Sequence, residues 1–344
     1  MGPKTQPGKA TTLRPKIAAF PKGYFDELIA RDRLTIEDWV ASAATAEVEG
    51  VELYPRFLAS TGSSYLASLR RRAEDVGLEL PMMCSSPDFV DPHPGAWEAV
   101  VESMREMVDV MVELSPGPGW RSVRVLSGQA WPGVDEDEAL GRVVEGVQRV
   151  VSYASERAVH VVMENHYKDG LWEYPEFAQS SRLFLSIVEQ VSSPWFGVNF
   201  DPSNAIVAGE DPLGLLRQVI GSVCSMGASD RSLRPGYSLE DLRSHRGAGY
   251  PEALQHGVVG QGLNDYPAML SALAAQGFDG WISIEDGERA GQEGLQDIRD
   301  SARYLRSLVD KYWPQGAHQD DGSRATAAPG VPGAAATTGQ EGSK

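Results

Sequence analysis

Cysteine and long apolar runs are both scarce in this chain of 344 residues. Only Cys84 and Cys224 are present, each inside an apolar segment. Two core thiols without a framework of spaced cysteines are typical of a reducing compartment, so we expect a cytoplasmic protein. No run approaches the roughly 18 apolar residues of a membrane span, and the N-terminus lacks the apolar core of a signal peptide. The sequence therefore predicts no membrane partner.

Positive charge is also in short supply. The chain has 31 Lys and Arg against 48 Asp and Glu, which gives a formal net charge of −17. The first sixteen residues contribute +4 and residues 315–344 contribute −1, so the part between them carries −20. A field of that sign repels phosphate backbones, and we therefore expect no nucleic-acid partner.

Several catalytic motifs are missing as well. The chain has no Gly-x-Ser-x-Gly nucleophile turn and no phosphate-binding loop ending in Gly-Lys-Thr/Ser. No Gly-x-Gly-x-x-Gly follows an early strand, which disfavours a doubly wound, dinucleotide-binding sheet. These absences remove acyl-transfer, P-loop and nicotinamide chemistry from the leading hypotheses.

What the chain does contain is a regular alternation of apolar runs and helical patterns. Thr35 with Asp38 three residues on predicts one helix start, and residues 231–262 read as one long loop. Residues 1–13 and 315–344 are rich in Gly, Pro, Ala and Thr, and we expect disordered tails around a single domain over 14–314. Eight strands alternating with helices predict an α/β protein of the (β/α)8 TIM-barrel class, with strands at 16–20, 50–54, 78–84, 122–126, 159–164, 196–201, 222–226 and 280–285.

Three of these expected strands end in an acid: Glu164, Asp201 and Glu285. Residues at the carboxyl ends of barrel strands face a common bowl, where active sites lie. A single acid there is as readily explained by capping the next helix or pairing with an arginine. Three of them favour shared use as oxygen ligands of a divalent cation.

An ordered set of short motifs resembles the xylose isomerase-like sugar isomerases and epimerases of TIM-barrel fold. The resemblance runs from about Lys16 to Trp313, and its pieces are Val51-Glu52-Leu53, Met163-Glu164-Asn165-His166, Asn199-Phe200-Asp201-Pro202-Ser203-Asn204, Ala228-Ser229-Asp230, Gly260-Gln261-Gly262 and Ile284-Glu285. It implies one divalent ion held by Glu, Asp, His and Glu. Those positions are Glu164, Asp201, Gly227 and Glu285 here, with Glu164 and Glu285 as the catalytic pair that transfers a proton.

Gly227 departs from the family pattern, because the expected ligand there is a histidine. In one interpretation the site holds its metal through three carboxylates and water, which favours Mn, Mg or Co over Zn. Alternatively, His166, His245 or Asp230 fills the gap. In a third interpretation the metal and its chemistry are lost, which leaves a barrel that only binds a small molecule or a partner.

The resemblance implies a sugar or related hydroxy-carbonyl substrate, isomerised or epimerised through an enediolate. A lyase, either a dehydratase or an eliminating deglycosidase, is the alternative on the same scaffold. Glu52 is expected to bind substrate or to pair with Arg124, and a homo-oligomer is possible. The expected substrate-binding residues are Glu52, Arg124, His166, Asn204, Arg231 and Gln261.

Overall fold

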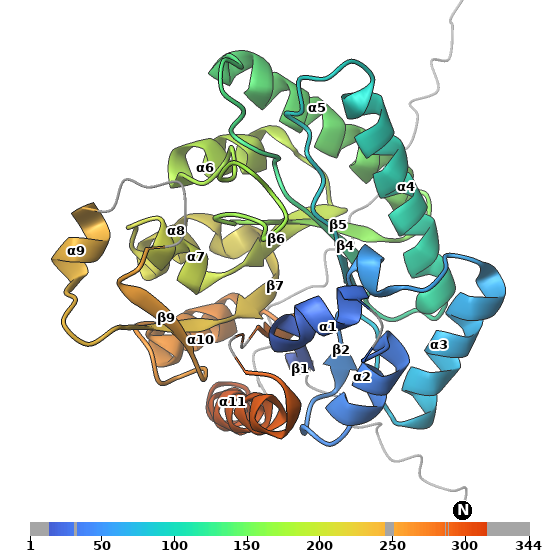
Figure 1. Cartoon of the computed structure of the whole chain (residues 1–344), viewed down its shortest axis with the longest axis vertical. Helices are drawn as coiled ribbons and strands as arrows, with labels where there is room; N and C mark the ends of the chain where they lie inside the picture. The colour runs from blue at the N-terminus through green and yellow to red at the C-terminus, as the bar shows by residue number, and fades with distance from the viewer. Residues whose placement is uncertain (1–13, 31–32, 245–250, 286, 288, 315–344) are drawn as a thin grey trace, which may run out of the picture.

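The fold, seen in a computed structural model, is a parallel barrel surrounded by helices (Figure 1). The structure describes residues 14–30, 33–244, 251–285, 287 and 289–314. Within them the strands follow the order β2-β1-β10-β7-β6-β5-β4-β3, and parallel bridges from Gly50 to Glu79 and from Leu53 to Met83 join the two ends. The barrel strands are β1 (Lys16–Ala19), β2 (Gly50–Val51), β3 (Met82–Cys84), β4 (Ser122–Val125), β5 (His160–Glu164), β6 (Phe196–Phe200), β7 (Val223–Ala228) and β10 (Trp281–Ile284).

The predicted (β/α)8 TIM barrel is therefore confirmed, and each predicted strand corresponds to one strand of the barrel. The tails predicted for residues 1–13 and 315–344 lie outside the described residues. In the part of the chain that is described, no helix has both the length and the apolar character needed to cross a membrane.

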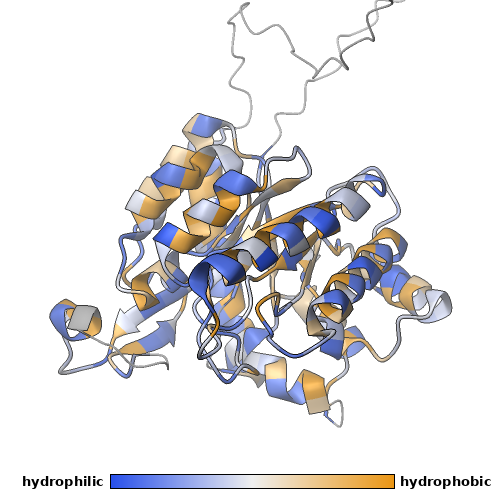
Figure 2. Ribbon diagram, turned by 90° about the horizontal axis from the view of Figure 1, so that it is seen from above, coloured by the Kyte–Doolittle hydropathy of each residue, from blue (hydrophilic) through white to orange (hydrophobic). Residues whose placement is uncertain are grey.

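The helices cover the outside of the barrel, and Figure 2 shows hydrophilic and hydrophobic residues alternating along them, as amphipathic helices require. Their bounds are α1 (Phe25–Ala30), α2 (Ile36–Ala43), α3 (Ser63–Asp75), α4 (Ala96–Leu114), α5 (Glu136–Ser155), α6 (Ser181–Gln190), α7 (Pro202–Val207), α8 (Pro212–Val219), α9 (Leu239–Ser244), α10 (Tyr266–Gln276) and α11 (Gly291–Tyr312), with short 3-10 turns at Lys22–Tyr24, Pro55–Phe57 and Ile220–Ser222.

The predicted helix start at Thr35 is confirmed. The Thr35 hydroxyl accepts a hydrogen bond from the Asp38 backbone N–H at 3.2 Å, and the Asp38 carboxylate accepts one from the Thr35 N–H, also at 3.2 Å. This reciprocal capping box satisfies two backbone donors that the first turn of α2 would otherwise leave unpaired.

Two predictions about regular structure were wrong in part. The expected strand over 78–84 begins only at Met82, because Pro81 has no N–H to donate to a neighbouring strand. The segment after β7 is not one long loop: β8 (Asp230–Leu233) pairs antiparallel with β9 (Leu254–Gly257), and α9 lies between them. The residues 245–250 inside it are not described.

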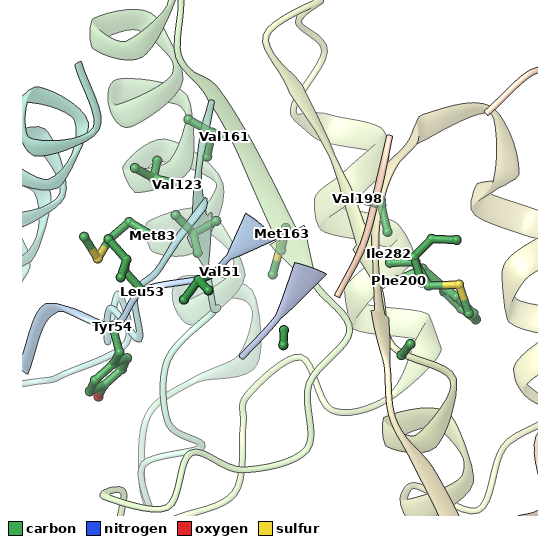
Figure 3. Close-up of a cluster of buried hydrophobic side chains, with 14 of the residues drawn as sticks. Val51, Leu53, Tyr54, Met83, Val123, Val161, Met163, Val198, Phe200 and Ile282 are labelled. Atoms are coloured by element: carbon green, nitrogen blue, oxygen red, sulfur yellow. The ribbon is translucent and has the colours of Figure 1, made fainter. Parts of the chain in front are cut away.

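Successive residues of the barrel strands face two different environments, the apolar core between strands and helices and the interior of the barrel. On β5, Val161 and Met163 belong to the main apolar core between strands and helices, where Figure 3 shows them with Val123 and Val198. Because successive strand residues point to opposite faces, Glu164 points into the barrel instead. The register continues this inward row across the sheet: Cys84 lies beside Arg124, Glu164 beside Asn199, and Ser283 beside Gly227. The top of the barrel interior is therefore polar.

Candidate active site

Three inward-facing carboxylates meet at the mouth of the barrel. Glu164 ends β5, Asp201 follows β6 and Glu285 follows β10. One oxygen of each lies within 4.8 Å of the oxygens of the other two. Glu164 and Asp201 are each 1% exposed. The structure thus brings together the three residues that were predicted from the sequence as metal ligands.

Each of the three acids also has a partner within the protein. Arg124 forms a buried ion pair with Glu164 at 2.5 Å, and Asn204 donates to the other oxygen of Glu164 at 3.0 Å. Asp201 caps α7 by accepting from the backbone N–H of its second residue at 2.7 Å. Lys22 lies 3.5 Å from Glu285. Arg124 thus pairs with Glu164 and not with Glu52, contrary to one of the two expectations for Glu52.

These contacts leave the cluster with excess negative charge. The pKa of Asp201 is raised to about 7, first by burial and then by the nearby charges of Glu285 and Glu164, while Lys22 and Ser229 act against the rise. A buried carboxyl group that resists ionising beside two other carboxylates is a suitable setting for a cation. Because all three donors are carboxylate oxygens, the residues present fit a hard divalent ion such as Mg²⁺ or Mn²⁺.

Gly227 lies where the resemblance places it. A Cβ atom added there would be 3.1 Å from Oε1 of Glu285 and 3.5 Å from Oδ2 of Asp201. A side chain at position 227 would therefore enter the carboxylate cluster directly. The register of β7 against β10 produces this result, because Gly227 pairs with Ser283, two residues before Glu285.

Of the three groups proposed to replace the missing imidazole, Asp230 is engaged elsewhere, and His166 is engaged through one of its two ring nitrogens. Asp230 accepts hydrogen bonds at 2.9 Å from the backbone N–H groups of Gly260 and Gly262, and so holds the turn before α10. Nδ1 of His166 contacts Glu176 at 2.9 Å. His245 lies outside the described residues.

A cavity of about 240 Å³ opens beside the cluster. Its wall combines aromatic rings, basic side chains and two carboxylates, so both apolar and polar parts of a small ligand find partners there. Its lining residues are Phe20, Lys22, Phe25, Tyr54, Cys84, Arg124, His166, Lys168, Asp169, Gly170, His256 and Glu285.

The six residues predicted to bind substrate do not all line the cavity. Arg124 and His166 line the cavity, and Asn204 reaches the cluster through Glu164. Arg231 is buried on β8. Gln261 is exposed in the turn before α10 and is not among the described residues that line the cavity.

Glu52 is 1% exposed and contacts Cys84, which lines the cavity. One of its oxygens accepts a weak hydrogen bond from the Cys84 thiol at 3.3 Å, and its other oxygen has no hydrogen-bond partner. Burial, followed by the charge of Glu285, raises its pKa to about 8. Burial and the neighbouring charge thus favour the protonated form of Glu52 in the metal-free protein.

Sequence reasoning missed two basic residues of the site. Lys22 follows β1 by three residues, so the strand-end rule that found the acids could have found it too. His256 comes from β9, whose hairpin was not expected. Burial, Lys22 and Arg231 lower the pKa of His256 to about 2, so its ring is neutral.

Comparison with known proteins identifies a matching family and several distant relatives. A family model described as a xylose isomerase-like TIM barrel matches residues 40–308. The inosose dehydratase of Geobacillus thermodenitrificans is 20% identical over 152 residues, which cover 43% of this chain and 47% of that protein. The putative L-ribulose-5-phosphate 3-epimerase SgbU of Escherichia coli is 20% identical over 240 residues, covering 69% and 76%. The chain thus spans about half the length of the inosose dehydratase that it matches.

Two solved structures have the same fold. D-psicose 3-epimerase from Clostridium cellulolyticum, solved with D-tagatose, superposes with a TM-score of 0.65 at 13% identity, over 86% of this chain and 99% of that one. A xylose isomerase domain protein from Planctomyces limnophilus superposes with a TM-score of 0.64 at 16% identity, over 88% and 99%. At these identities the likeness concerns the fold.

Proposed function

The chain belongs to the xylose isomerase-like TIM-barrel family, and we propose that it is a divalent-metal-dependent enzyme that moves a proton next to a carbonyl group. Its substrate would be a sugar or a related hydroxy-carbonyl compound, and its reaction an isomerisation or epimerisation. One observation carries this proposal: three buried carboxylates converge to within 4.8 Å. Such convergence of like charges is costly to folding unless a cation or a proton relieves it.

Glu164, Asp201 and Glu285 would hold the metal. A divalent cation held by these three residues would supply Lewis acidity next to the substrate carbonyl. Glu164 and Glu285 lie three strand positions apart in the barrel order, so their carboxylates approach a ligand in the bowl from different sides. One carboxylate removes the proton and the other returns it, and Arg124 and Asn204 fix the orientation of Glu164.

Elimination is the second candidate. Proton removal next to a carbonyl becomes a dehydration when the adjacent carbon loses its hydroxyl as water, so the same carboxylates serve both reactions. The inosose dehydratase that the chain matches over 43% of its length favours it. Both reactions begin with removal of the same kind of proton, and incubation of candidate substrates in D₂O with detection of C–H exchange by NMR tests that shared step.

Calorimetry with Mn²⁺ on dialysed protein tests the metal site. We expect binding in the unaltered protein and a loss of at least about tenfold in affinity, about 1.4 kcal/mol, for Asp201→Asn. Asp211→Asn is a matched control, because Asp211 also caps a helix ahead of a proline but lies at α8. If neither the unaltered protein nor Asp211→Asn binds Mn²⁺ or Mg²⁺, the metal-dependent function is wrong and the barrel that only binds a ligand gains support.

A further inference from the structure

Glu176 is a buried carboxylate that contacts His166, the histidine that follows β5 and lines the cavity. Oε2 of Glu176 lies 2.9 Å from Nδ1 of His166, and the Glu176 side chain is fully buried. Its other oxygen, Oε1, accepts hydrogen bonds from the backbone N–H of Ser127 at 2.7 Å and from the Ser127 hydroxyl at 2.8 Å. Glu176 thus links the end of β4 to the residue two positions after the catalytic Glu164.

The direction of each hydrogen bond in this link is fixed. The Ser127 N–H can only donate. The Ser127 hydroxyl accepts from the backbone N–H of Ala178 at 2.9 Å, and its own hydrogen is directed to Glu176 at 2.8 Å in preference to the Gly128 carbonyl at 3.4 Å. A carboxylate accepts on both oxygens. Nδ1 of His166 must therefore carry the hydrogen of its bond to Glu176, and Nε2 of the neutral ring is left as an acceptor.

We propose that Glu176 is a positioning residue that fixes the tautomer and orientation of His166, so that Nε2 accepts a hydrogen bond from a hydroxyl group of the substrate. His166 lines the cavity together with Arg124 and Glu285, and 13% of its side chain is exposed. With Nδ1 turned to Glu176, Nε2 lies on the far side of the ring. The tautomer stands on the structure alone, whereas the hydroxyl ligand rests on the function proposed above.

Glu176 also has a structural role, and the test must separate this role from the positioning of His166. Its backbone N–H donates to Tyr167 and that of Phe177 donates to Gly128, so this segment ties the loop after β5 to the end of β4. Loss of folding or of activity in a Glu176 variant would follow from either role. The protonation pattern of the His166 ring follows only from the positioning role.

Substitution of Glu176 by glutamine makes the two roles separable. Ser127 offers two donors to the Oε1 position, so the amide must place its oxygen there and its NH₂ group toward His166. Nδ1 then faces a donor and must accept. The isosteric Glu176→Gln change keeps the bonds to Ser127 and inverts the tautomer, leaving the hydrogen on Nε2.

Nitrogen-15 NMR of histidine-labelled protein measures this directly. Spectra are recorded without substrate at alkaline pH, where the imidazole is neutral, and His166→Asn assigns the signal. We expect hydrogen on Nδ1 in the unaltered protein, on Nε2 in Glu176→Gln, and on Nδ1 in the control Glu173→Gln, an exposed neighbour in the same loop. Hydrogen on Nε2 in the unaltered protein, or the same tautomer in both proteins, overturns the proposal.

The substrate part has its own readout. Once D₂O exchange identifies a substrate, a derivative in which one hydroxyl is replaced by hydrogen should bind less tightly than the parent to the unaltered protein. In His166→Asn the two should bind with similar affinity. If every single-hydroxyl derivative loses as much affinity in His166→Asn as in the unaltered protein, the hydroxyl contact is wrong. The NMR result is unaffected by whether any substrate is found, so failure of the proposed function and failure of the tautomer assignment are distinguishable.

Discussion

Glu52→Gln should make the stability of the metal-free protein less dependent on pH. Glu52 is buried, one of its oxygens has no hydrogen-bond partner, and its pKa is raised from 4.5 to about 8 by burial and by Glu285. At pH values below 4.5, the ordinary pKa of the group, Glu52 is neutral in both the folded and the unfolded chain. Between 4.5 and about 8 only the unfolded chain ionises, so the free energy of unfolding falls as pH rises. Glutamine cannot ionise, and removes this loss.

The size of the effect follows from the same values. The two pKa values differ by about 3.5, and each pKa unit corresponds to about 1.36 kcal/mol, so ionisation of Glu52 opposes folding by at most about 5 kcal/mol. Relaxation and water penetration reduce the penalties of buried charges, and we expect about 2–4 kcal/mol. The glutamine NH₂ group also lacks a strong partner, which costs about 1–3 kcal/mol at every pH. The variant should therefore be less stable than the unaltered protein in acid, and this deficit should shrink or reverse in base.

Urea unfolding at about pH 5 and about pH 9 with a chelator present checks this expectation. The quantity compared is the change in unfolding free energy caused by the substitution at one pH minus that at the other, which cancels the constant cost of the amide. Glu79→Gln is the control, because Glu79 is half-exposed and paired with Lys16. If Glu52→Gln gains no more stability between the two pH values than Glu79→Gln does, Glu52 does not hold a proton in the folded protein.

Three further outcomes are expected. Mn²⁺ affinity should rise with pH up to about 7 and then level off, because Asp201, with its pKa near 7, must lose its proton to act as a ligand, and calorimetry in buffers across this range measures it. Arg124→Met should lower the free energy of unfolding by about 3–5 kcal/mol in metal-free protein, because it leaves Glu164 buried without its ion-pair partner, and urea unfolding measures the loss. Gly227→His should raise Co²⁺ affinity at least about tenfold, about 1.4 kcal/mol, with a new visible absorption band, whereas Gly227→Ala should do neither.

The barrel and the position of its acids were predictable because both depend on local patterns. β5 and β6 are short runs rich in β-branched and aromatic residues, and an acid stands at or just after the end of each. Parallel barrel strands end on the same face, so acids at the ends of three strands must share one bowl. No long-range information is needed for that step. The expectation of oxygen ligands at Glu164, Asp201 and Glu285 followed from it, and the structure brings the three together.

The rest of the site depends on how irregular segments fold back, which spacing does not encode. His256 reaches the cavity only because β9 pairs with β8, and neither Asp230–Leu233 nor Leu254–Gly257 has the apolar alternation of a strand. Glu176 lies ten residues beyond His166 in a loop, and nothing in its sequence context indicates that it turns back beneath the ring. The sequence likewise offered Arg124 as one of two alternative partners for Glu52, because it could not show that Arg124 pairs with Glu164.

The balance of charge inside the barrel accounts both for the raised pKa values and for the expectation that a metal binds. Glu52, Glu164, Asp201 and Glu285 are four carboxyl groups, and Arg124 and Lys22 are the two cations in contact with them. Two negative charges are left over, and two of the four carboxyls, Glu52 and Asp201, have pKa values raised to near or above neutral. Protonation of these two groups would balance the charge inside the metal-free barrel, and one divalent cation would balance it equally. Replacement of histidine by Gly227 changes neither balance, because a neutral imidazole carries no charge. Loss of that ligand therefore weakens the preference for Zn²⁺ over Mg²⁺ and Mn²⁺ without removing the electrostatic reason for a metal to bind.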